Sequence, residues 1–198
     1  MGCVTTKDVV DVRQISRDKW ITVRQRSLVK DTWPLLLDGP RDQEQLLGVE
    51  VFVRIFSRYP ELKALFSFRD VDDDALLLQH PGFLCHSAAF IRAIGAAVDR
   101  MSDWEDQLGP LLIELGGMHA TTPGFDEFNF EVFVESLIHV WSVRLGDVFH
   151  AEVRESWEIL FIYLMMKLRE GYHLTMAQYQ GYTDATTLSE KENRIDPY

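Results

Sequence analysis

The chain has 198 residues, of which 46% are hydrophobic and 12% aromatic, and a formal net charge of −11. This length and composition predict one globular domain with extensions. The domain is large enough to bury a stable hydrophobic core without disulfides or metals to reinforce it. The negative charge argues against a nucleic-acid partner. Two cysteines without a CxxC motif exclude a disulfide framework and favour a reducing compartment.

The first residues, MGCVTTK, match the N-myristoylation pattern M-G-x-x-x-[ST]. Gly2 is the expected acceptor, and Cys3 beside it offers a thiol for a second, palmitoyl chain. One myristoyl chain alone binds membranes only marginally, so a second signal is needed. Residues 1–30 carry a charge of +4 and the remainder −15, which suits an anionic leaflet. A chance match to this short pattern is the alternative.

We therefore predict that residues 1–24 are an N-terminal extension holding the protein at the cytoplasmic face of a membrane, with the plasma membrane favoured. The longest uninterrupted apolar run, ILFIYLMM at residues 159–166, cannot span a bilayer, because spanning takes about 20 residues. The expected contact with lipid is therefore made through acyl chains and the basic segment.

The next residues predict two helices. Thr22 and Gln25 form a capping-box pattern at the start of the first, and Pro34 should end or kink it. The second, within residues 43–59, is followed by a short turn that opens at Pro60. The residues expected to face inward are Val23, Leu28 and Trp33 in the first helix and Leu46, Val49, Phe52, Val53 and Phe56 in the second.

A charged loop, RDVDDD, leads to a longer helix that begins after Pro81 and Gly82 and runs to about Met101. The loop lacks the glycine that a calcium loop needs for its sharp turn. The stretch FLCHSAAF in the helix places His86 on the same apolar face as two phenylalanines. A buried imidazole without a partner costs about 1–3 kcal/mol, so His86 needs either a protein neighbour or a bound group.

A second histidine, His119, ends the apolar stripe of the following helix. Gly116 and Gly117 each cost about 1 kcal/mol in a helix, which indicates that another segment approaches this backbone closely. Helices at about 126–145 and 151–171 then complete an all-α domain of about seven to eight helices over residues 25–173. The polar, aperiodic residues 174–198 predict a disordered tail.

Two neutral imidazoles directed into one apolar slot are suitable axial ligands for a haem iron. Two alternatives remain open at this point. Each histidine can be a core residue bonded to a carbonyl or water, or a zinc site can form from His80, Cys85, His86 and His119. The zinc site is weaker, because Cys85 and His86 point about 100° apart on a helix. The aromatic residues available as walls of a haem slot are Phe52, Phe66, Phe83, Phe90, Phe125 and Phe133.

Residues 27–172 resemble a globin, most closely the neuroglobin and globin X branch. The motifs in order are VFVRIFSRYPELKALFSF, with Phe66, then FLCHSAAF, with the distal histidine His86, and LGGMHA, with the proximal histidine His119. VESLIHVW and ESWEILFIYLM are similar to the family's last two helices, and an MGC start is a feature of globin X. The resemblance implies a globin fold around a haem b pocket.

The resemblance also implies roles for single residues. His119 would bind the iron through Nε2, with Nδ1–H bonded to a carbonyl near Leu115. His86 would take the sixth position when no gas is bound. Two departures stand out: Phe90 occupies a position where relatives have a smaller aliphatic residue, and Ala89 a position where many have a basic residue for a haem propionate. Arg92, one turn further on, is the expected substitute.

We expect a bis-histidyl, membrane-attached globin that binds O2, NO or CO and acts in redox chemistry or signalling, with an unknown reductase as electron donor. Electron transfer, nitrite reduction, nitric oxide removal and lipid protection are the candidate activities. A reversible oxygen carrier or sensor without turnover is the alternative, and a haem-free helical adaptor is the third hypothesis.

Overall fold

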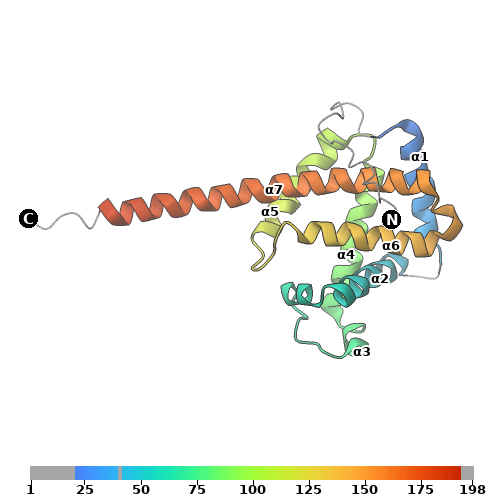
Figure 1. The fold of residues 1–198 in the computed structure, drawn as a ribbon, viewed down its shortest axis with the longest axis horizontal. Coiled ribbons are helices and arrows are strands. Elements are labelled where there is room, and N and C mark those ends of the chain that lie inside the picture. The colour runs from blue at the N-terminus through green and yellow to red at the C-terminus, as the bar shows by residue number, and fades with distance from the viewer. Residues whose placement is uncertain (1–20, 40–41, 193–198) are drawn as a thin grey trace, which may run out of the picture.

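The computed structural model describes residues 21–39 and 42–192, with side chains described as far as residue 180. This part of the chain is all-helical and contains no strand, as predicted. The elements are α1 (Val23–Leu36), α2 (Gln43–Arg58), the 3₁₀ helix η2 (Pro60–Leu65), α3 (Asp74–Leu77), α4 (Pro81–Asp99), the π-helix η3 (Trp104–Leu108), α5 (Gly109–Ala120), α6 (Asn129–Leu145), the 3₁₀ helix η4 (Gly146–Val148) and α7 (Ala151–Glu192). Figure 1 shows the other helices packed together and α7 extending far beyond them.

Helix α1 begins with the predicted capping box. The Thr22 hydroxyl accepts the backbone N–H of Gln25 at 3.2 Å, and the Gln25 side chain accepts the N–H of Thr22 at 3.0 Å. The helix ends at Leu36, two residues after Pro34. The prediction that Val23 faces inward is wrong, since its side chain is 82% exposed. The buried positions are Val29, Thr32 and Leu36, and Val23 lies about 120° away from Val29 at 100° per residue.

The buried face of α2 also differs from the expected one. Leu46 and Val53 are exposed, whereas the buried positions are Leu47, Gly48, Val51, Phe52 and Ile55. Apolar residues surround most of this helix, so their spacing alone does not select a face. The contact with α4 determines which face of α2 is buried. The helices approach so closely that a Cβ on Gly48 would overlap the backbone carbonyl of Ser87. The two helices therefore cross with their backbones in contact.

Helices α5 and α7 cross even more closely. A Cβ on Gly116 would overlap the carbonyl of Leu168, and a Cβ on Gly171 would overlap the carbonyl of Ile113. The prediction that another segment approaches the backbone at Gly116 is therefore confirmed, and that segment is α7. Gly117 beside it is less constrained, because its Cβ would meet only the hydroxyl end of Thr175, at 2.7 Å.

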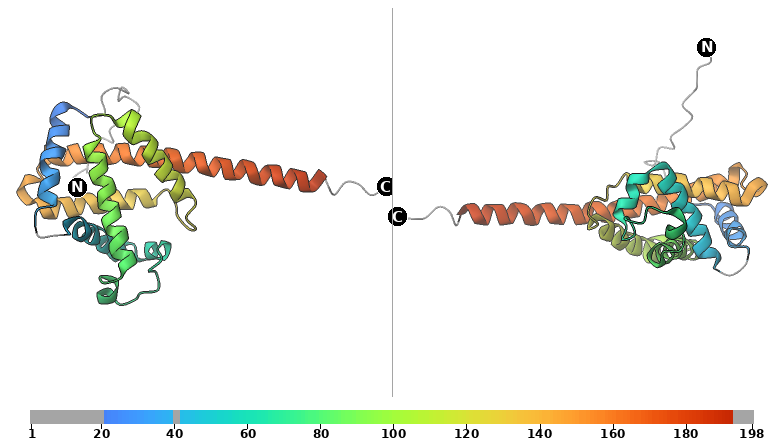
Figure 2. Two further views of the ribbon diagram at one scale, coloured as in Figure 1. Left: turned by 180° about the vertical axis from the view of Figure 1, so that it is seen from behind. Right: turned by 90° about the horizontal axis from the view of Figure 1, so that it is seen from below.

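Helix α7 is longer than expected, at 42 residues, or about 63 Å at 1.5 Å per residue. Both views in Figure 2 show its second half projecting from the packed helices. The structure thus has a helix through Glu192 where the sequence predicts a disordered tail from residue 174; residues 193–198 lie outside the described part. Residues 174–192 contain no proline and one glycine. A helix already nucleated within the domain extends at little cost through such a sequence.

Of the described helices, only α4 is long and apolar enough to cross a membrane by length and composition. Its inward residues, however, belong to the core: Phe83, Ser87 and Ile91 are completely buried. Core helices of globular domains have the same composition, so α4 is explained by its packing against α2 and the rest of the core.

Candidate functional site

The two helices that carry the predicted histidines bring them to one region of the fold. His86 lies on α4, in the turn next to the Gly48–Ser87 crossing, and His119 lies near the C-terminal end of α5. They are close enough that a charge on His119 opposes protonation of His86 and lowers its pKa. The two side chains thus share a site although 32 residues separate them in the sequence.

The His119 ring is held in one orientation by its own helix. Its Nδ1 lies 2.7 Å from the carbonyl oxygen of Leu115. A carbonyl only accepts hydrogen bonds, so Nδ1 carries the proton and donates it. The predicted bond to Leu115 is therefore present. It leaves the lone pair of Nε2 as the free metal-binding position of the ring.

Desolvation lowers the pKa of both histidines. For His86 the charge of His119 is the second cause in the same direction. For His119 the Leu115 carbonyl acts the other way and offsets part of the effect on its pKa. His86 is exposed by its accessible surface, yet the rings on one side of it remove enough water to lower its pKa. The lowered pKa of each imidazole favours its neutral form, which is the form that binds metals.

Aromatic rings pack around His86. Its ring centroid lies 5.1 Å from that of Phe52 and 5.0 Å from that of Phe66, with both pairs edge to face. Phe52 is completely buried and is also in contact with Phe90 at 5.3 Å and Phe133 at 5.8 Å. Phe83 packs behind this layer, 6.4 Å from Phe52. Five of the six predicted aromatic residues are thus gathered on the His86 side.

The sixth predicted aromatic residue, Phe125, lies on the His119 side, with ring centroids 4.8 Å apart. Phe130 contacts the same imidazole at 5.4 Å and is nearly buried. The sequence places Phe130 on the apolar face of its helix but does not assign it to the site. The two imidazoles therefore lie among apolar aromatic rings, an arrangement that suits a flat, apolar group ligated from both sides.

The globin family model matches residues 49–167, more than half of the chain. The chain belongs to the globin family. It is similar to cytoglobin-2 of Danio rerio (25% identity, covering 79% of this chain and 85% of the relative) and to neuroglobin of the same species (27% identity, 77% and 92%). Among solved structures it is similar in fold to a hexacoordinated heme protein from an anhydrobiotic tardigrade, with a TM-score of 0.70, 24% identity and coverage of 77% and 96%. The predicted globin fold is confirmed, and the similarity to neuroglobin supports the predicted neuroglobin type.

Arg92 forms an ion pair with an acidic residue of α2 in this globin. Its guanidinium Nη1 lies 3.9 Å from an oxygen of Glu44 at the start of α2. Arg92 follows His86 by six residues and therefore projects from a different side of α4. Both it and Ala89 are exposed. The expected role of Arg92 as a substitute for a basic residue toward a haem propionate stays a prediction.

The zinc alternative finds no support in the globin. Within residues 21–39 and 42–192, no three His, Cys, Asp or Glu side chains gather to hold a metal ion. His80 instead caps α4, with its Nδ1 accepting the N–H of Gly82 at 3.1 Å. Cys85 is exposed.

Tyr172, which is not among the predicted site residues, closes the His119 side of the site. The Tyr172 hydroxyl on α7 donates to the carbonyl oxygen of Phe125 at 3.3 Å, so the long helix holds the loop that packs on His119. A signal was available, because Tyr172 continues the four-residue spacing of Leu164 and Leu168. An aromatic ring with a polar tip at the end of an apolar stripe is typical of a position where a core meets a loop.

The lowered pKa values predict how stability depends on pH when no cofactor is bound. Both groups have an unfolded pKa near 6.5 and a lower folded pKa, so the unfolded chain binds more protons in that window. Their stabilising contribution is present above about pH 6.5 and is lost as pH falls through the folded values. We expect the urea midpoint of the cofactor-free globin to fall between pH 7 and pH 5. This decrease in the urea midpoint should be smaller in His86→Leu than in the control His139→Gln, which changes an exposed position on α6. Equal decreases in the two variants would contradict the role given to His86.

Proposed function

We propose that this globin binds haem b between His119 and His86 and serves in redox chemistry with diatomic gases rather than in oxygen storage. The observation that carries the proposal is the pair of imidazoles that lie among aromatic rings. The donor set fits haem: there are two nitrogen ligands and no gathering of carboxylates around them in the described chain. The relatives point the same way, since they include neuroglobin and a structural neighbour described as a hexacoordinated heme protein.

Each residue has a definite task in this proposal. His119 holds the iron through Nε2, because the Leu115 carbonyl keeps the proton on Nδ1. His86 would be the second nitrogen ligand of the cofactor in the absence of gas. The rings of Phe52, Phe66, Phe90 and Phe133 keep water from the distal side. Haem iron supplies reversible binding of O2, NO and CO and one-electron exchange.

Competition by His86 is the reason to favour redox chemistry over storage. An internal ligand reduces the apparent gas affinity by the fraction of time that it leaves the position open. It also keeps the surroundings of the iron alike in both oxidation states, which favours electron exchange. The donor of electrons in this scheme is an unidentified reductase. A reversible carrier would work without one, so haem reduction by cell extract at a rate matching gas consumption distinguishes the two.

Optical spectra of the purified globin test the assignment of His86. We expect low-spin spectra in both oxidation states, and conversion of the ferrous form to high spin in His86→Ala, because alanine leaves the sixth position without a protein ligand. Carbon monoxide should then bind on the order of tenfold faster or more, since the fraction of open sites rises. His139→Ala, at an exposed position on α6, is the matched control. A wild-type spectrum that is already high-spin would rule out internal ligation.

We also propose that acyl chains on Gly2 and Cys3 attach the globin to the cytoplasmic face of a membrane. Both residues lie outside the described part of the chain, and the proposal rests on the MGCVTT pattern and the basic N-terminal segment. Gly2→Ala should move the protein from the membrane pellet to the supernatant on fractionation of cells, whereas Val4→Ala should leave it in the pellet. Membrane association of Gly2→Ala equal to that of wild type would refute the anchor.

A further inference from the structure

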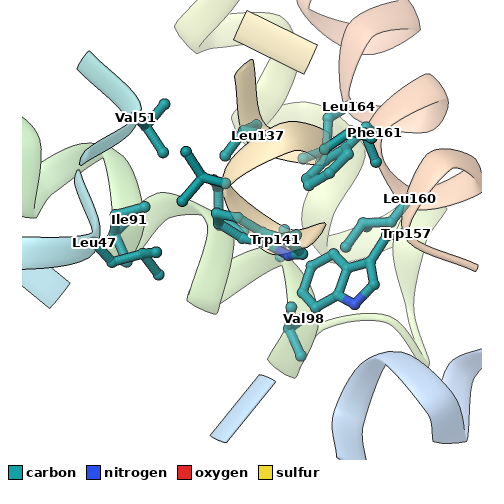
Figure 3. Packing of buried hydrophobic residues seen from close by; sticks show 14 of the residues in the cluster. Leu47, Val51, Ile91, Val98, Leu137, Trp141, Trp157, Leu160, Phe161 and Leu164 are labelled. Atoms are coloured by element: carbon teal, nitrogen blue, oxygen red, sulfur yellow. The ribbon is translucent and has the colours of Figure 1, made fainter. Parts of the chain in front are cut away.

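Three indole rings lie in mutual contact where α1, α6 and α7 meet. The ring centroids of Trp33 and Trp141 are 6.4 Å apart, those of Trp33 and Trp157 6.1 Å, and those of Trp141 and Trp157 5.5 Å. Figure 3 shows the last pair beside Phe161. Trp141 and Trp157 are completely buried, whereas Trp33 is only partly buried. This three-tryptophan cluster therefore connects the core with the surface.

Helix α6 joins the cluster to the histidine site. Phe133 packs against Phe52, the ring that touches His86. Leu137 and Trp141 follow Phe133 at four-residue steps along one face of α6, so Trp141 lies about 12 Å from Phe133 along the helix. Figure 3 shows Leu137 and Trp141 on the same side of this helix. The route between them passes through closely packed side chains, which favours electron tunnelling.

The surroundings of the indole nitrogens differ within the cluster. Trp157 donates its N–H to the Thr32 hydroxyl at 3.0 Å, and that hydroxyl donates in turn to the carbonyl of Leu28 at 2.6 Å. The Nε1 of Trp141 is buried and has no acceptor within the described chain. An indole that has lost an electron is a strong N–H acid and needs a proton acceptor. Within the cluster only Trp33 has access to bulk water, so loss of the proton favours the radical there.

We propose that the three-tryptophan cluster carries oxidising equivalents from the haem site to the surface at Trp33. This inference rests on the proposed haem function. A hydroperoxide reduced at the site takes up two electrons and two protons and yields an alcohol and water. With haem bound between the histidines, one of these electrons would come from the cofactor. Trp33 would supply the other through Trp141 and Trp157 while its indole proton passes to water, and solvent would supply the two protons that the hydroperoxide takes up.

A reductant of the thiol or ascorbate class at the surface then returns one electron and one proton to Trp33, and a second equivalent restores the iron. Indoles are hard to oxidise, so the route operates with hydroperoxides and not during ordinary reduction of the haem. Its effect is to take a damaging oxidant away from the buried side chains around His86 and to a position where small reductants reach it.

Freeze-quenched electron paramagnetic resonance tests this in the full haem-loaded chain mixed with tert-butyl hydroperoxide. Growth with ring-deuterated tryptophan identifies an indole radical. We expect a tryptophan signal in wild type and a severalfold loss in Trp33→Phe. Trp104→Phe is the matched control, because that indole stacks on Tyr163 at 4.3 Å, outside the cluster, and should leave the signal unchanged. An equal signal in Trp33→Phe, or a wild-type radical on tyrosine alone, would overturn the proposal.

A second measurement separates failure of the relay from failure of haem binding. A ruthenium photosensitiser is attached to Cys85, which is exposed one residue before His86, in the full chain carrying Cys3→Ser. After flash oxidation of the metal, transient absorption should show a tryptophan radical that is lost in Trp33→Phe and retained in Trp104→Phe. If the yield of tryptophan radical is the same with and without Trp33, the proposed electron relay is wrong, whether or not the chain takes up haem. Circular dichroism of each variant verifies that it is folded.

Discussion

His119→Ala should abolish tight haem retention. The substitution removes the nitrogen that the Leu115 carbonyl holds in place, and the remaining ligand, His86, is mounted on a different helix. Loss of a hydrogen-bonding partner of a metal ligand already weakens metal affinity by about 10–100-fold, so loss of the ligand itself should weaken it by more. The measurement is transfer of haem to an excess of a scavenger apoprotein, followed in the visible spectrum.

Two comparisons make that result specific. His86→Ala should lose haem far more slowly than His119→Ala, because the fixed Nε2 of His119 remains. Added imidazole should restore binding to His119→Ala if the side chain acts as a ligand and not as a packing element. Haem transfer from His119→Ala at the wild-type rate would exclude His119 as the proximal ligand.

Gly116→Ala should be among the most damaging single-methyl changes in the described part of the chain, together with Gly171→Ala at the same crossing. The added Cβ would overlap the backbone carbonyl of Leu168, and no side-chain rotation relieves contact with a backbone. Helices α5 and α7 must separate, at a cost of about 3 kcal/mol, the upper end of what overpacked cores lose. Urea unfolding followed by circular dichroism gives the free energy of unfolding.

The neighbouring glycine provides the control. Gly117→Ala adds the same methyl group one residue later, where it meets only the movable hydroxyl of Thr175. The gain in helix propensity of about 0.5–1 kcal/mol offsets this contact, so its stability should stay close to that of wild type. Equal losses in the two variants would mean that α5 and α7 do not cross in backbone contact.

The parts of the fold that are predictable from the sequence are those determined by local chemistry. The Thr22–Gln25 capping box, the start of α4 at Pro81 and the bond from His119 to the Leu115 carbonyl each involve residues within one turn. His86 and His119 can be paired from the sequence because histidines on two successive apolar stripes have few explanations. The family resemblance adds the order and spacing of the motifs around them.

The predictions that are wrong concern features that depend on contacts between residues far apart in the sequence. Leu46 and Leu47 are equally apolar, and only the crossing of Gly48 with Ser87 determines which of them is buried. No apolar stripe in the sequence predicts that α7 continues beyond residue 174. This part of the helix projects from the packed helices and therefore needs no apolar face.

The glycine crossings have a consequence for the geometry between the two imidazoles. Ser87, the backbone partner of Gly48, directly follows His86, and Gly116 precedes His119 by three residues. Each ring is therefore mounted within a turn of a point where main chains touch, and main chains yield far less than interdigitated side chains do. Each histidine is consequently mounted on a helix whose position is fixed by backbone packing, so exchanging the phenylalanines around the site should alter its chemistry and contents before it moves either helix.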